Sequence, residues 1–188
     1  MVAKTPRLLT AEQRDAFVRI PTDLSERDLG RFYTLSARDL QIIDRHRRPA
    51  NRLGFAVQLG LLRFPGRTLA DVPEVPARVV EYIAQQVGVD PAAFEQYGER
   101  DNTVFEHLDE LRREFGFRNC GWPQLRALGR ELLPLALESD RALPLVETAV
   151  ERLRAQQIIA PGITTLERLV WTVQRLAQRR VDGSSSSH

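Results

Sequence analysis

The chain of 188 residues is 43% hydrophobic and 28% charged, a composition that is typical of a folded globular protein and excludes intrinsic disorder. No stretch approaches the roughly 20 apolar residues of a membrane span, and a single cysteine excludes an internal disulfide framework. The formal net charge of +2, with 26 of 27 basic residues being arginine, permits a nucleic-acid partner without demonstrating one. We expect a reducing, cytoplasmic setting and no membrane partner.

Helix signals follow one another along the chain, while strand alternation is scarce. Pairs that form capping boxes precede three of the predicted helices: Thr10 with Gln13, Ser36 with Asp39, and Thr103 with Glu106. Pro49 stands where a further helix would begin, a position at which its missing N–H costs nothing. The pattern predicts an all-α fold of about nine helices, either as one compact domain or as two packed lobes.

The glycine-containing segment 116–121 is the clearest linker in the chain. It divides the helical region 1–180 into lobes of residues 1–115 and 122–180. Residues 181–188 end in a run of serines, and we expect them to form a flexible, low-complexity tail outside the fold. The abrupt end is typical of a fragment of a longer protein.

Residues 36–64 predict a helix-turn-helix-like pair with a strongly basic turn. Arginine forks bind phosphate or guanine, and Asn51 and Gln58, seven residues apart on one helical face, carry amides that can read adenine. The stretch 53–64 is so apolar that only the first turn of its helix could reach DNA. The predicted DNA-binding residues are Arg45, Arg47, Arg48, Asn51, Arg52 and Arg67. The alternative is a solvated basic corner in which Asn51 is a local cap.

Two further basic clusters occur at residues 112–130 and at the end of the last helix, 175–180. Arginines near a helix C-terminus complement the helix dipole without any partner. Trp122 and Trp171 are expected to pack in the core.

A catalytic site is not indicated, because acids, bases and nucleophiles do not converge in any motif. His107 and Glu110 have the spacing of metal ligands on one helical face, but no second helix supplies a matching pair. We expect no catalytic residue, no metal and no cofactor, with an autonomous metal enzyme as the remote alternative.

Residues 7–23, 32–67 and 89–117 resemble the N-terminal domain, a domain of unknown function, of Tn-three family transposases. The match continues through residues 132–137 and 152–159, and its most specific part is RRPANRLGFAVQL at 47–59 with LRFPGR at 62–67. The resemblance implies a bacterial protein of a transposable element that acts in replicative DNA transposition and recombination. It also implies double-stranded DNA as the partner, in the form of the terminal inverted repeats of the transposon.

In this family, DNA cutting belongs to a separate C-terminal domain with an aspartate-aspartate-glutamate metal site. The resemblance therefore implies a non-catalytic fragment of a DNA transposase. The alternative is a helical module for self-assembly, or for docking the remainder of the transposase, that makes no sequence-specific DNA contacts.

Overall fold

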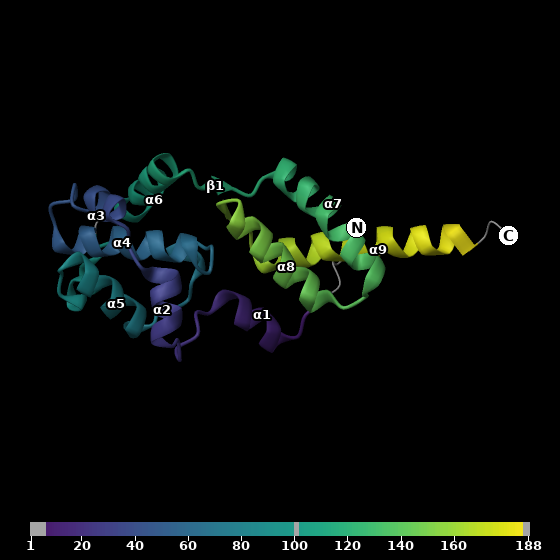
Figure 1. Ribbon diagram of the computed structural model, residues 1–188, viewed down its shortest axis with the longest axis horizontal. Helices are drawn as coiled ribbons and strands as arrows, with labels where there is room; N and C mark the ends of the chain where they lie inside the picture. Colours follow the sequence, from purple (N-terminus) through teal and green to yellow (C-terminus); the bar gives the residue numbers. More distant parts are fainter. Residues whose placement is uncertain (1–6, 100–101, 186–188) are drawn as a thin grey trace. The chain divides into compact units, whose positions relative to one another are not determined.

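The computed structural model describes residues 7–99 and 102–185, and nearly all regular secondary structure within these is helical (Figure 1). The described residues form nine α-helices: α1 (Ala11–Val18), α2 (Glu26–Tyr33), α3 (Ala37–Ile43), α4 (Pro49–Arg63), α5 (Ala77–Val87), α6 (Thr103–Phe115), α7 (Trp122–Glu138), α8 (Ala142–Ala155) and α9 (Ile163–Ser185). Two short 3-10 helices, η1 (Leu69–Asp71) and η2 (Pro91–Gln96), and two paired strands, β1 (Arg118–Asn119) and β2 (Ile158–Ile159), complete the elements. The predicted all-α fold is confirmed.

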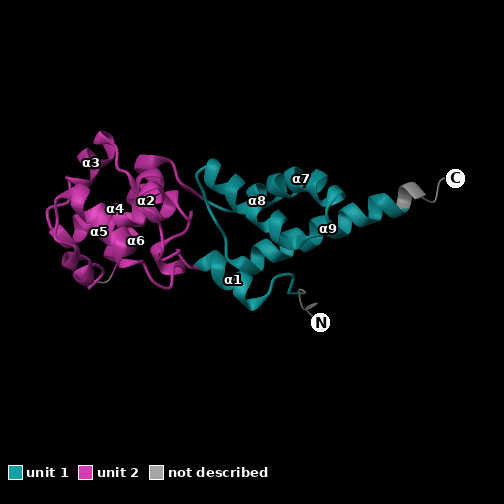
Figure 2. Cartoon of the chain, turned by 60° about the horizontal axis from the view of Figure 1, so that its bottom comes forward, with its two compact units in different colours: residues 1–18, 119–188 teal, residues 19–118 magenta. Residues whose placement is uncertain are grey.

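The chain divides into two compact units (Figure 2). Unit 2 comprises Arg19–Arg118, and unit 1 combines the described residues up to Val18 with those from Asn119 onward. This division differs from the lobes 1–115 and 122–180 because α1 belongs with α9. The carboxylate of Glu167 accepts the backbone N–H groups of Leu8 and Leu9, each at 3.1 Å, and pairs with Arg14 at 2.6 Å. Local sequence patterns carry no sign of contacts between residues so far apart in the chain.

Unit 2 is built around α4, which is contacted by α2, α3, α5, α6 and η2. Its residues from Leu53 to Leu62 are all buried. Gly54 lies against the ring of Tyr97, where a Cβ atom would come within 2.1 Å of the ring. The predicted pair of helices at 36–64 is present as α3 and α4, but α4 is the core of the unit and not an exposed recognition helix.

Unit 1 packs α7, α8 and α9 around an apolar core that includes Leu132, Val146 and Val170. α7 runs as one helix from Trp122 to Glu138 although Pro134, a residue that favours a kink or a break, lies inside it. Trp122, which was expected to pack in the core, is 72% exposed at the start of α7. No helix in the described parts of the chain is long and apolar enough to cross a membrane.

Two of the three predicted capping boxes are present in the structure, and the third is not. Backbone and side-chain hydrogen bonds confirm the boxes at Thr10 with Gln13 and at Ser36 with Asp39. The third prediction is wrong: the N-cap of α6 is Asn102, with a positive φ of 74°, and Thr103 is already inside the helix. Phe105 has the helical spacing of the buried Leu108 and Leu111 but is itself 65% exposed.

The end of the chain also differs from the expectation of a tail beginning at residue 181. α9 continues to Ser185. The remaining residues of the expected tail, 186–188, lie outside the described residues.

Candidate nucleic-acid interface

The basic turn occupies residues 44–48, between the end of α3 and the start of α4. Ser36 caps the N-terminus of α3, and Asp44 is its C-cap at the start of the turn. Pro49, directly after the turn, is the first residue of α4. Arg48 is the N-cap of α4 but makes no side-chain capping hydrogen bond. Because the first N–H groups of a helix lack intrahelical partners, the start of α4 presents positive partial charge beside the arginine side chains.

Two of the predicted arginines form ion pairs within unit 2. Arg45 pairs with Glu114 of α6 at 2.8 Å between Nη1 and Oε1. Arg52 pairs with Asp44 and also donates to the backbone carbonyl of Val87, at 3.2 Å, near the end of α5. These two side chains tie the turn to α6 and α5, and their charges are partly neutralised.

Arg47 and Arg48 differ from these neighbours. Both side chains are exposed, and neither forms an ion pair or hydrogen bond with any residue that the structure describes. Arg48 and the half-buried Asn51 line a hollow of about 330 Å³ at the start of α4, whose other polar members include Gln96, Glu99 and Thr103. The turn thus offers two uncompensated cations beside a polar hollow.

Two other residues of the sequence-based hypothesis lie inside the unit. Arg67 is 2% exposed, and burial lowers the pKa of its guanidinium. Gln58 is 1% exposed and donates to the hydroxyl of Tyr97 at 2.6 Å and to the carbonyl of Val104 at 3.1 Å. Neither side chain belongs to the exposed surface of the turn, so Gln58 does not share an accessible face with Asn51.

A polar cluster fills the interior behind the turn. The ring centroids of His46 and His107 lie 4.5 Å apart, with the ring planes tilted by 55°, and the hydroxyl of Tyr97 shares a hydrogen bond with Nδ1 of His107 at 2.8 Å. Burial, together with the neighbouring His46, lowers the pKa of His107 to about 4. The cluster is therefore neutral near pH 7 and contributes packing to unit 2.

The alternative of a metal site at His107 and Glu110 does not match this arrangement. Glu110 places Oε1 at 3.5 Å from Nε2 of His46, while His107 faces Tyr97. In residues 7–99 and 102–185, no three or more histidine, cysteine, aspartate or glutamate side chains gather in a way that could hold a metal ion.

Comparison with known proteins places the chain in a family. A family model described as a domain of unknown function, DUF4158, matches residues 8–173. The chain belongs to the DUF4158 family. It is 42% identical over 180 residues to the transposase for transposon Tn1546 of Enterococcus faecium, a match that covers 96% of this chain and 18% of that protein.

Two further relatives are also transposases. The chain is 42% identical over 174 residues to the transposase for transposon Tn501 of Pseudomonas aeruginosa, and 38% identical over 175 residues to that for transposon Tn21 of Escherichia coli. Each match covers 93% of this chain and 17% of the relative. The resemblance to transposases of this family is confirmed, and this DUF4158 chain spans less than a fifth of the length of these relatives.

The partners of the paired arginines are the features that sequence reasoning missed. Glu114 and Asp44 carry the charges that occupy Arg45 and Arg52. Asp44 lies beside the cluster in the sequence and could have been suspected. Glu114 is 69 residues away from its partner, and no local pattern connects the two.

Proposed function

We propose that this DUF4158 chain is the DNA-binding N-terminal part of a Tn-three family transposase and that it recognises the terminal inverted repeats of the transposon. Its relatives are named as transposases for transposons, and their hosts include Enterococcus faecium and Escherichia coli. The proposed partner is double-stranded DNA, in the bacterial cytoplasm. Cutting and strand transfer in replicative transposition belong to the part of the transposase outside this chain.

The observation that carries the proposal is the pair of exposed cations at the basic turn. Arg47 and Arg48 have no carboxylate partner among the described residues, whereas Arg45 and Arg52 do. The charge of an arginine without an internal partner is not neutralised by a neighbouring carboxylate, so it is available to a ligand. Each phosphate that such an arginine neutralises releases counterions from the duplex.

The burial of α4 restricts how the turn can meet DNA. Because residues from Leu53 to Leu62 are buried, α4 cannot lie along the major groove as a recognition helix does. Only its first turn is available. In our proposal Arg47 and Arg48 contact backbone phosphates, and Asn51 reaches the nearest base edge or sugar.

Glu99 limits the position of the phosphate. It lines the hollow together with Arg48 and Asn51, and a carboxylate repels an approaching anion. We therefore place the phosphate on the side of Arg48, next to the first N–H groups of α4. Arg45 and Arg52 act in this proposal as positioning residues, because their ion pairs hold both ends of the turn.

The test is binding of the purified chain to a duplex of its own terminal inverted repeat and to a shuffled duplex of the same composition, over a range of salt concentrations. We expect at least about tenfold tighter binding to the repeat and a log–log salt slope of about −0.9 per phosphate contact. Equal affinity for both duplexes at every salt concentration would overturn sequence-specific recognition.

A further inference from the structure

Unit 1 carries an apolar groove between α7 and α9 that the proposed function does not use. Its volume is about 400 Å³, and its floor is formed by leucine and valine side chains, among them Leu125, Leu133, Leu169, Val173 and Leu176. Gly129 of α7 faces Leu169, and a Cβ at this glycine would stand 3.3 Å from the leucine, so the groove begins where the two helices approach closely.

Apolar side chains remain open to water along this groove. Trp122 is 72% exposed and Leu176 is 46% exposed, although both are large and apolar. Exposed apolar surface that is gathered in one hollow marks a binding surface more often than isolated exposed leucines do. A partner that covered the groove would bury this surface.

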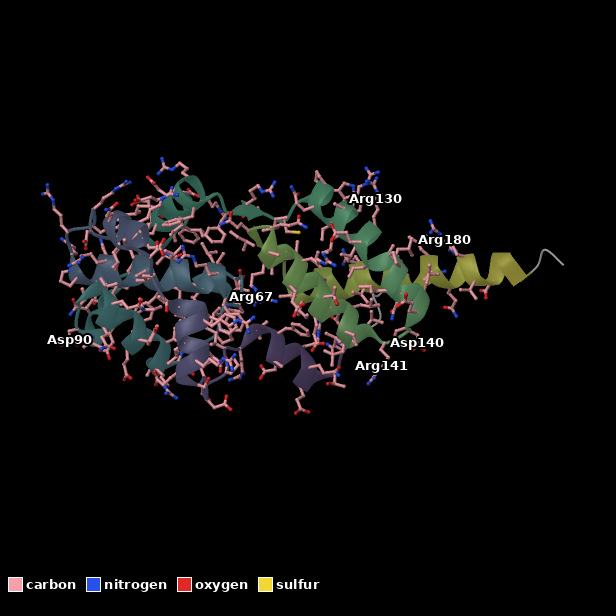
Figure 3. All side chains as sticks on the ribbon, in the orientation of Figure 1. Arg67, Asp90, Arg130, Asp140, Arg141 and Arg180 are labelled. Carbon is pink, nitrogen blue, oxygen red and sulfur yellow. The ribbon has the colours of Figure 1, made fainter. Side chains whose placement is uncertain are left out.

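The rim of the groove is basic. Arg126 and Arg130 come from α7 and Arg180 comes from α9, and the residues that line the groove include no acid. All three arginines are exposed, and none has an ion pair or hydrogen bond within residues 7–99 and 102–185. Figure 3 places Arg130 and Arg180 at the upper edge of unit 1, whereas Arg141 lies at its lower edge.

The rim and the floor together define the chemistry of the occupant. An apolar floor favours a row of apolar side chains, as an amphipathic helix presents at every third or fourth position. Three uncompensated arginines favour carboxylates on both sides of that row. Duplex DNA would satisfy the rim with its phosphates but has no apolar side chains to fill the floor.

We propose that the groove between α7 and α9 binds an acidic amphipathic helix of a protein partner. Leucine-like side chains of the partner cover the exposed Trp122 and Leu176, and its carboxylates pair with Arg126, Arg130 and Arg180. The expectation of a docking module for the remainder of the transposase thereby gains a defined surface. The proposal is independent of DNA binding through the basic turn of unit 2.

The probe is a pair of synthetic helical peptides of about 15 residues, long enough to form helix. Both carry the same row of leucines, flanked by glutamates in one peptide and by lysines in the other. The isotope-labelled chain has two tryptophans, whose indole N–H signals are assigned with Trp122→Phe. We expect the glutamate peptide to shift the Trp122 signal and to bind at least about tenfold more tightly than the lysine peptide.

Charge reversal provides the decisive variants. Arg126→Glu combined with Arg130→Glu should invert the preference between the two peptides. Arg141→Glu, a single charge reversal at an exposed arginine outside the groove, should leave it unchanged. Thermal unfolding of each variant checks that unit 1 stays folded.

Two results would overturn the proposal. One is a failure to distinguish the two peptides, seen either as no shift of the Trp122 signal with either peptide or as equal affinity for both. The other is a Trp122 shift produced by random-sequence duplex DNA and abolished by the double reversal, which would assign the groove to nucleic acid.

Discussion

The basic turn before α4 and the interior of α4 hold polar side chains in opposite situations. In the basic turn, the side chains of Arg47 and Arg48 are exposed and have no partner among the described residues. About two to three turns further along α4, Gln58 is 1% exposed and donates to Tyr97, which in turn reaches His107. One helix thus carries a surface open to a ligand and, a few residues away, a closed hydrogen-bond network.

The difference teaches that residue type does not decide whether a polar side chain serves binding or folding. The arginines between residues 45 and 52 divide in the same manner, because Arg45 and Arg52 meet carboxylates and Arg47 and Arg48 do not. What decides is the presence of a partner from another helix. Substitutions in the interior should therefore change stability, and substitutions at the open turn should change DNA binding alone.

The largest effect is expected at Gly54, where the interior tolerates no added atom. In Gly54→Ala the new Cβ would stand 2.1 Å from the ring of Tyr97, which is held by hydrogen bonds to Gln58 and His107. We expect a loss of about 3 kcal/mol in the free energy of unfolding, measured by urea denaturation.

Gly30→Ala is the matched control for this substitution. Its Cβ would meet only the hydroxyl of Tyr82, at an ordinary distance of 3.8 Å. The control should be neutral or stabilise the protein by up to about 1 kcal/mol, since alanine favours the helix. Equal losses for both variants would contradict the tight packing of α4.

The next effect concerns the buried ion pair that joins α3 to α4. Asp39 is 2% exposed and accepts from Arg63 at 2.7 and 2.9 Å. We expect Asp39→Asn to lower the free energy of unfolding by about 2 kcal/mol. Asp109→Asn removes an exposed pair with Arg112 and should cost less than about 0.5 kcal/mol.

The pH dependence of the same pair follows from its pKa. Burial acts to raise the pKa of Asp39, but its hydrogen bonds with Arg63 and Ser36 outweigh burial and lower the pKa. A lowered pKa in the folded state contributes stability that is present above the unfolded value, near 4, and is lost as the pH falls through the folded value. Asp39→Asn should reduce the acid sensitivity of unfolding in this range.

The buried histidines make the free energy of unfolding depend on pH in a higher range, and we expect this effect to be smaller. The pKa of His107 is about 4 in the folded state and near 6.5 when unfolded. The unfolded chain therefore binds more protons between these values, and stability falls as the pH is lowered from 7 to 5. We expect a loss of about 1–2 kcal/mol from His107 in urea denaturation.

His46 adds to this dependence in the same direction. Burial and Arg45 lower the pKa of His46, while Glu110 opposes them. His107→Gln should remove most of the loss between pH 7 and 5. A loss of the same size in wild type and in His107→Gln would exclude His107 as its source.

The smallest loss of stability is expected at Arg52, between the basic turn and the buried interior of α4. Arg52→Ala removes the pair with Asp44 and the hydrogen bond to the carbonyl of Val87. Because the side chain is partly exposed, we expect a loss of about 1 kcal/mol. Arg48→Ala, four residues earlier, should leave the free energy of unfolding unchanged. A larger loss for Arg48→Ala would show that this arginine also has an internal partner.

Much of the fold could be predicted from local sequence signals. Ser36 with Asp39, Pro49 at the start of α4, and Gly88 at the end of α5 set helix ends through contacts within a few residues. The apolar stretch after Asn51 likewise predicted the buried helix of unit 2. Each of these signals is complete within one turn or one helix, so the sequence alone suffices.

The rest depended on contacts between distant segments. Glu167 has the spacing from Thr164 that is typical of a capping box, but its carboxylate accepts the backbone N–H groups of Leu8 and Leu9 from the other end of the chain. Glu114 neutralises Arg45 across 69 residues. For the proposed site, the sequence could not show which predicted arginines are paired or buried, and these contacts separate Arg47 and Arg48 from Arg45, Arg52 and Arg67.

DNA binding through the basic turn is tested by the salt dependence of binding in two double variants. Arg47→Ala with Arg48→Ala should weaken binding to the terminal inverted repeat and flatten the log–log salt slope by about 1.8, the value for two lost phosphate contacts. Arg27→Ala with Arg78→Ala, at arginines of unit 2 outside the basic turn, should change neither quantity. An unchanged slope in the first pair, or an equal change in both, would contradict DNA binding through the basic turn.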